Sequence, residues 1–325
     1  MKKNIFATAL LVFSGALAAI AGQIETRGIP ADAAGVAQAN VGDLFKSSLL
    51  QNATARAARF FREIEQETEN DLWRAWGVSD PFKKITSVTV GFKVVKDTRG
   101  PEAVIFIARG NFVPSEILEA LTQQRCKHSK LGAAGTRANI GKYSFVTIDE
   151  GRSLAGVYDA NTIILIIEQD AVANLATAKA VLAALEGSSK SYVLPSMPVG
   201  QDWKIARPFF SFHVKFSSWK VNAPLHFVFP PTMPKPRDLR MAFGEDGSVF
   251  KFRLVMGYDT AAKAREAQSS VKALISEMLV RKSSDGKLHP MIKLLWAIKV
   301  DASGENFTIT VDYPIAEIYK DFDNN

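Results

Sequence analysis

A run of strand, tight turn, strand and helix between Asp238 and Leu279 constrains the fold of this chain more than any other stretch. Apolar residues occupy alternate positions on both sides of the turn, as in half-buried strands: Leu239, Met241 and Phe243, then Phe250, Phe252, Leu254 and Met256. Asp246-Gly247 between them is typical of a two-residue hairpin turn. The following helix has an apolar side made of Ala264, Ala267, Val271, Leu274, Ile275 and Met278. The stretch therefore predicts a hairpin covered by its own helix.

The same alternation assigns the charged residues of this hairpin to one side. Because side chains point to opposite faces with a period of two, we expect Arg240, Lys251 and Arg253 to face solvent. Met241, Phe252 and Leu254 would then lie on the buried side. On this interpretation, truncating Phe252 to alanine costs about 3–5 kcal/mol, the range for a buried phenylalanine.

An earlier part of the chain has the same order of elements, so the sequence predicts two copies of one module. Val88–Leu121 corresponds to Leu239–Leu274, hairpin to hairpin and helix to helix. From Ala33 to Ile148 the order is strand, helix, strand, strand, helix, strand, which is the ferredoxin-like order. We therefore expect an α+β fold of two divergent ferredoxin-like-related modules, with mostly antiparallel sheets and helices packed on one face.

The length of 325 residues suits two such modules, and we place the boundary in the Gly- and Ser-containing stretch from Gly187 to Gly200. The predicted division is an N-terminal α+β module over residues 22–190 and a C-terminal one over 191–325. In the C-terminal module a Pro-rich insertion, residues 217–236, replaces the first helix because its prolines cannot all be helical.

The first 21 residues have the pattern of a secretory signal peptide. Lys2 and Lys3 precede an apolar run from Ile5 to Ile20, and Ala19-Ile20-Ala21 fits the cleavage rule before Gly22. A membrane anchor is the alternative, but about 16 residues rich in Ala and Gly are short for a span. We predict a periplasmic or secreted protein, bacterial in type, with no transmembrane segment after cleavage.

The net charge indicates which classes of partner are expected, and the cysteine content indicates whether disulfides are. The formal net charge of +7 includes the two signal lysines and is scattered, so weak contact with anionic surfaces is allowed but not required. Nucleic acid is not expected, since no basic stripe interleaved with aromatic residues occurs. The single cysteine, Cys126, excludes an internal disulfide framework. A buried structural thiol is favoured there over a reactive one.

Local motifs for chemistry are missing. Gly135–Ser144 resembles a phosphate loop, but its spacing is one residue too long and Tyr143 stands where Ser or Thr belongs. The four histidines lack a partner at metal-ligand spacing, and His213 fits a structural residue in a strand. The sequence therefore predicts no cofactor, no metal and no catalytic residue.

Several features together resemble uncharacterised exported bacterial proteins with two divergent α+β modules. They are the signal peptide, a hairpin running into Ala108-Arg109-Gly110-Asn111-Phe112, the apolar strand Thr162–Glu168 and the C-terminal hairpin-helix-hairpin unit. The resemblance covers most of the mature chain and implies the same two-module architecture. It supplies no catalytic residue.

The Pro-rich insertion holds the candidate binding residues. Phe227 and Phe229 stand beside Pro230 and Pro231, which makes an exposed apolar partner-binding segment one interpretation. A connection packed across its own sheet is the other, since the two phenylalanines alternate as in a strand.

Two functions remain open at this point. The first is a non-enzymatic role in the cell envelope, either structural or in binding a small ligand or an envelope protein. The second is a hydrolase-type enzyme whose site lies at the module interface and uses His213, Asp202 and Ser211, because spatial sites need no local motif. The missing catalytic motif favours the first.

Overall fold

The computed structural model describes residues 24–51, 84–94, 102–123, 135–148, 151–168, 170–194, 205–216, 233–280 and 292–323. Three sets of predicted residues lie outside these ranges: the signal peptide, Cys126, and most of the Pro-rich insertion with Phe227, Phe229, Pro230 and Pro231.

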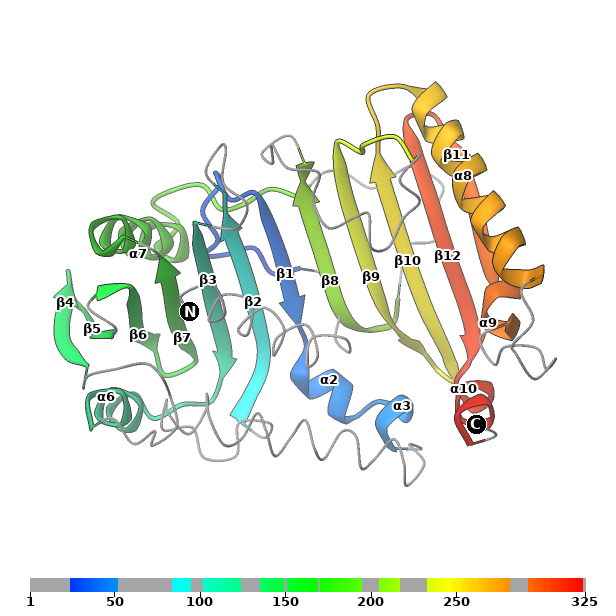
Figure 1. Ribbon diagram of the computed structural model, residues 1–325. Coiled ribbons are helices and arrows are strands. Elements are labelled where there is room, and N and C mark those ends of the chain that lie inside the picture. The colour runs from blue at the N-terminus through cyan, green and yellow to red at the C-terminus, as the bar shows by residue number, and fades with distance from the viewer. Residues whose placement is uncertain are drawn as a thin grey trace, which may run out of the picture.

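A single sheet of 12 strands runs through the described chain (Figure 1). Its order is β11-β12-β10-β9-β8-β1-β2-β3-β7-β6-β5-β4, and every neighbouring pair is antiparallel. The strands of the first half are β1 (Gly35–Ala39), β2 (Ile85–Lys93), β3 (Ala103–Gly110), β4 (Thr136–Ile140), β5 (Tyr143–Ile148), β6 (Ser153–Asp159) and β7 (Thr162–Glu168). Those of the second half are β8 (Arg207–Lys215), β9 (Asp238–Asp246), β10 (Val249–Gly257), β11 (Ile298–Ser303) and β12 (Asn306–Pro314).

Few helices accompany this sheet, which makes the fold α+β with an antiparallel sheet, as predicted. They are α2 (Val41–Phe45), α3 (Ser48–Gln51), α6 (Pro114–Gln123), α7 (Ala171–Glu186), α8 (Ala261–Val280), α9 (Ile292–Trp296) and α10 (Ile315–Asp323). Sequence signals mark the ends of α7. The Asp170 side chain accepts a hydrogen bond from the Val172 N–H, and Gly187 closes the helix in the left-handed conformation at φ +77°.

The two-module ferredoxin-like arrangement is not confirmed, because strands from both halves belong to one sheet. The seam between the halves is the antiparallel pair β1–β8, in which Ala37 lies opposite Phe212. Outward from this seam the order is β1-β2-β3-β7-β6 on one side and β8-β9-β10-β12-β11 on the other. Counted outward from the seam, each half begins with one strand (β1 or β8) and continues with a hairpin (β2–β3 or β9–β10). A second hairpin follows, and its later strand (β7 or β12) pairs with the first hairpin. The two halves therefore have the same strand order.

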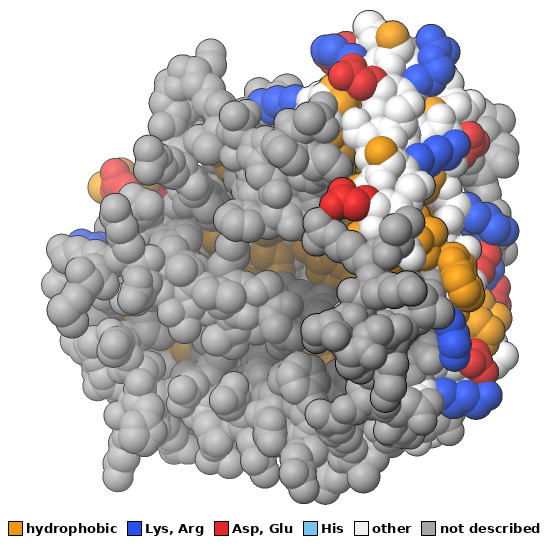
Figure 2. Space-filling model, turned by 45° about the vertical axis from the view of Figure 1, so that its right-hand side comes forward, with side chains coloured by type: hydrophobic (Ala, Val, Ile, Leu, Met, Phe, Trp, Pro, Cys, Tyr) orange, Lys and Arg blue, Asp and Glu red, His pale blue; other side chains and the backbone are white. Residues whose placement is uncertain are grey.

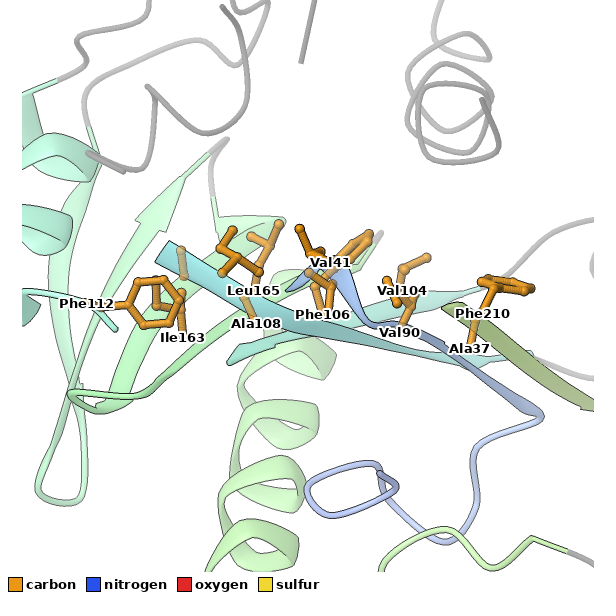
Figure 3. Close-up of a cluster of buried hydrophobic side chains, with 14 of the residues drawn as sticks. Ala37, Val41, Val90, Val104, Phe106, Ala108, Phe112, Ile163, Leu165 and Phe210 are labelled. Carbon is orange, nitrogen blue, oxygen red and sulfur yellow. The ribbon is translucent and has the colours of Figure 1, made fainter. Parts of the chain in front are cut away.

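One face of the sheet carries mostly apolar side chains on the strands between the edge strand β4 and β11, and we call it the continuous apolar face. Figure 3 shows the part near the centre, where side chains such as Ala37, Val90, Phe106 and Phe210 project to the same side. Leu44 of α2 and Ile117 and Leu121 of α6 pack on this part. In the second half the same face carries Leu254, Met256 and Phe307 under Ala264, Ala267 and Val271 of α8. Both hairpin-covering helices therefore lie on the same side of the sheet.

The opposite face changes character between the two halves. In the first half it is apolar, with Ile105, Ile107, Ile164 and Ile166 buried under Val181 and Leu185 of α7. In the second half the cross-strand register places Ser211, His213, Arg240, Arg253 and Thr308 on this face. Among the described residues, both faces of the sheet are therefore covered by apolar packing in the N-terminal half but not in the C-terminal half.

The C-terminal hairpin has the predicted register, but one of its arginines is not solvent-facing. Gly247 occupies the turn at φ +62°, and Phe252 lies opposite Phe243. Arg253 is only 3% exposed because its Nη1 donates to the carbonyls of Phe252 (2.9 Å) and Val311 (3.0 Å). Its Nη2 lies 2.7 Å from Asp312 Oδ1. The prediction of an exposed Arg253 was wrong, since a guanidinium satisfied by carbonyls and a carboxylate tolerates burial.

The predicted burial of Phe252 also needs correction. Its side chain is half-buried rather than buried, and it packs against the cluster under α8. The range of about 3–5 kcal/mol for a fully buried phenylalanine is therefore an upper limit for Phe252→Ala.

A buried carboxylate ties the first half to the hairpin of the second. Glu245 Oε2 accepts hydrogen bonds from the N–H (2.9 Å) and Oγ (2.7 Å) of Ser48, the first residue of α3. Arg207 Nη1 lies 2.6 Å from Glu245 Oε1, while the Glu245 side chain is 3% exposed. The helix start and the ion pair together satisfy this carboxylate, which fixes α2 and α3 against the end of the β8–β9 pair.

Candidate functional site

Five phenylalanines form a connected row on the continuous apolar face: Phe92 of β2, Phe210 and Phe212 of β8, Phe243 of β9 and Phe250 of β10. We call this row the phenylalanine surface. The ring centroids of successive members are 6.1 Å (Phe92–Phe212), 6.4 Å (Phe210–Phe212), 5.6 Å (Phe210–Phe243) and 6.3 Å (Phe243–Phe250) apart. These spacings are in the range of favourable aromatic pairs.

The phenylalanine surface crosses the seam between the halves. Phe92 and Phe212 come from strands on either side of β1, so the contact between them passes over that strand. Phe210 is buried, whereas the other four rings are half-buried. Phe212 and Met241 also contact both the central core and the core under α8. The surface is thus a partly accessible apolar bridge between two cores.

The side of the molecule that carries α8 is hollowed next to that helix. In Figure 2 the described atoms visible at the floor of this hollow are hydrophobic, whereas the outer side of α8 carries Lys, Arg, Asp and Glu. The described part of this floor can therefore make apolar contacts with a ligand.

A second cluster lies on the opposite face at the same seam. The hydroxyl of Tyr192 lies 2.7 Å from Nδ1 of His213, and the two rings are 5.7 Å apart. His213 is fully buried, and its Nε2 has no hydrogen-bond partner among the described residues. Burial lowers the pKa of His213 to about 4, and Arg240 and Lys215 act in the same direction, while Asp238 opposes them. The imidazole is therefore neutral near pH 7.

Cationic groups surround this histidine. Arg240 lies directly opposite His213 on β9, and Lys215 follows two positions along β8 on the same face. The Lys215 ammonium sits 4.1 Å from the centre of the Tyr192 ring, a cation–π contact. Burial lowers the pKa of Arg240. The sequence suggested a satisfied structural histidine here, but the structure satisfies only one of its two nitrogens.

The residues of the hydrolase alternative do not form a nucleophile–base pair in the described structure. Ser211 and His213 share one face of β8, as their spacing requires. However, Nδ1 of His213 is next to Tyr192 and Nε2 has no partner, so no hydrogen bond joins Ser211 to His213. A pKa near 4 also makes a poor general base at neutral pH. Asp202 lies outside the described residues.

The described residues contain neither a metal-binding cluster nor a membrane-spanning helix. None of them form a group of three or more His, Cys, Asp and Glu side chains placed to hold a metal ion. No helix within the described ranges is both long enough and apolar enough to cross a bilayer.

Comparison with known proteins shows similarity of structure only. No protein-family model and no curated protein matches the chain. Three crystal forms of a protein designated TP0453 are similar over almost the whole of both chains. Form I has a TM-score of 0.49 and 8% identity, covering 93% of this chain and 98% of that one. Form III has 0.45 and 7%, covering 93% and 99%, and form IV has 0.43 and 8%, covering 95% and 98%. Similarity at this level assigns no function.

Proposed function

We propose that the protein is a non-enzymatic binding protein of the cell envelope that takes up an apolar ligand on the phenylalanine surface. The observation that carries this proposal is the row of ring contacts from Phe92 to Phe250, in which every ring except that of Phe210 is half-buried at the middle of the sheet. Half-buried aromatic rings gain free energy when a ligand removes the rest of their surface from water, about 25 cal/mol per Å². Contiguous accessible apolar area on a folded protein commonly marks a binding site.

The rigidity of the platform supports the same proposal. The rings come from four strands that are joined by antiparallel pairing through β1. Side chains on paired strands are held more firmly than those on loops, so the ligand would meet a preformed surface. A preformed surface loses little conformational entropy on binding.

A neutral fluorescent probe tests this function. The full chain is titrated with N-phenyl-1-naphthylamine, whose emission rises in apolar surroundings. We expect saturable binding that Phe243→Ala weakens by roughly tenfold, since one aromatic contact is worth about 1.4 kcal/mol. Phe243 is chosen because its ring contacts both Phe210 and Phe250.

Trp296→Ala provides the matched control, because Trp296 is an aromatic residue 66% exposed on α9 and outside the surface. Its effect on the dissociation constant should stay within about twofold. The proposal is contradicted if the probe does not bind saturably, or if both variants weaken binding equally. Thermal unfolding of each variant confirms that the comparison is between folded proteins.

We also propose that the protein is exported, with residues 1–21 removed as a signal peptide. The charged start, apolar run and Ala-x-Ala end support this. N-terminal sequencing of protein recovered from its native cell should yield Gly22 as the first residue. A soluble product that still begins at Met1 would disprove export by cleavage.

The modules 22–190 and 191–325 are proposed to be divergent copies of one unit. The support is the equal strand order counted outward from β1 and from β8, and the position of α6 and α8 on the same face. Partner binding through Phe227, Phe229, Pro230 and Pro231 stays a prediction.

A further inference from the structure

We propose that His213, Lys215 and Arg240 form a binding site for an oxyanion, the carboxylate or phosphate group of a ligand, on the face of the sheet opposite the phenylalanine surface. This site is independent of the apolar site, because neighbouring positions of β8 point to opposite faces. Phe212 belongs to one face, and His213 to the other.

The unpartnered nitrogen of His213 is the first observation. A phenol hydroxyl donates readily to an imidazole nitrogen, so we assign the Tyr192 O–H as the donor to Nδ1. In that tautomer Nε2 carries the proton of the neutral ring. This N–H is buried without an acceptor. A buried donor left unsatisfied destabilises the folded state, and an anionic acceptor would remove that cost.

The charge around His213 is the second observation. Within the described part of the chain, the Lys215 ammonium contacts the Tyr192 ring and has no carboxylate partner. Arg240 adds a half-buried guanidinium directly across from His213. The acid nearest in register, Asp238, lies opposite Lys215 but bonds at 2.9 Å to Nε of Arg237. Lys215 and Arg240 therefore place two cationic side chains next to His213, on the face that also carries Asp238.

These observations together select the chemistry of the ligand. Two cationic side chains at register positions next to His213 disfavour a cationic ligand, and an apolar group gains nothing from a buried N–H donor. An oxyanion accepts from all three, and charge-assisted hydrogen bonds are the stronger kind. His213 lies opposite Val36 in the β1–β8 pair, so the bound group would lie at the seam between the two halves.

The test follows the histidine ring directly. Full-length protein labelled with ¹⁵N-histidine is titrated with inorganic phosphate, and separately with acetate, at constant ionic strength up to about 50 mM. The chain has four histidines, and His213→Gln identifies the signal of His213 by its loss. We expect a saturable shift of the Nε2 resonance with at least one anion, and the stronger of the two anions distinguishes phosphate from carboxylate ligands.

Variants of the lysine separate a site from a general salt effect. Lys215→Met should raise the dissociation constant for the anion about tenfold or more, as expected for loss of one charge-assisted contact. Lys215→Arg should retain binding within a few-fold. Lys263→Met is the control, since Lys263 is an exposed cation on α8 that is paired with Asp259 at 2.9 Å.

Three outcomes would overturn the proposal: no saturable shift with either anion, equal binding by Lys215→Met and the unmodified chain, or equal weakening by Lys215→Met and Lys263→Met. Each leaves the apolar probe experiment unaffected, because that probe carries no charge.

Discussion

Replacing Gly156 of β6 with alanine should destabilise the protein by about 3 kcal/mol, the upper part of the range for overpacking a core. Gly156 lies directly opposite Phe145 of β5, and a Cβ built on Gly156 would come within 2.6 Å of Phe145 Cγ. Phe145 cannot move into solvent to make room, because it is fully buried beneath the α7 layer. Chemical denaturation of the two proteins measures the loss.

A double mutant separates this clash from an effect on strand propensity. Phe145→Ala alone should cost about 3–5 kcal/mol. If the clash is the cause, adding Gly156→Ala to Phe145→Ala costs almost nothing further, so the two changes are strongly non-additive. Gly42→Ala serves as control, because the nearest atom to a Cβ there is the Thr86 carbonyl oxygen at 3.9 Å. Additive effects of the pair would show that the ring does not lie over the glycine.

Acid should destabilise the protein through His213 by about 3 kcal/mol between pH 6.5 and pH 4. The pKa of His213 in the folded protein is about 4, below its ordinary value of 6.5. The unfolded chain therefore binds more protons in this interval, and stability falls as the pH is lowered. Above pH 6.5 both states hold a neutral ring, so the contribution is fully present there.

The measurement compares denaturant unfolding of the unmodified chain and His213→Gln across this interval, in buffer without phosphate. Glutamine does not titrate and its amide oxygen can accept from Tyr192, so its stability curve should lack the His213 component. Subtracting one stability curve from the other removes the contributions of other titrating groups. Glu168 is one of them, because burial raises its pKa. Parallel curves for the two proteins would mean that His213 is not buried as a neutral ring.

Local patterns in the sequence were sufficient for the individual elements. The alternation around Asp246-Gly247 predicted β9, its turn and β10, and the structure has the same register. Pro114 and Asp170 marked the starts of α6 and α7, and Gly187 the end of α7. The run Thr162–Ile167 predicted a strand with neighbours on both sides, and β7 lies between β3 and β6. Such features depend on residues close in sequence, whose periodicity and turn chemistry are visible directly.

The arrangement of these elements was determined by contacts between residues far apart in the chain. Nothing in the periodicity of β1 or β8 specifies that they pair, yet this pairing replaces two predicted sheets with one and brings Phe92 and Phe212 together. It was also tertiary contact that buried Arg253, through carbonyls of β10 and β12 and the carboxylate of Asp312, and that placed Tyr192 on His213. A strand pattern identifies which face is apolar, but the free energy of a polar side chain depends on its partners, and these are supplied only by the folded chain.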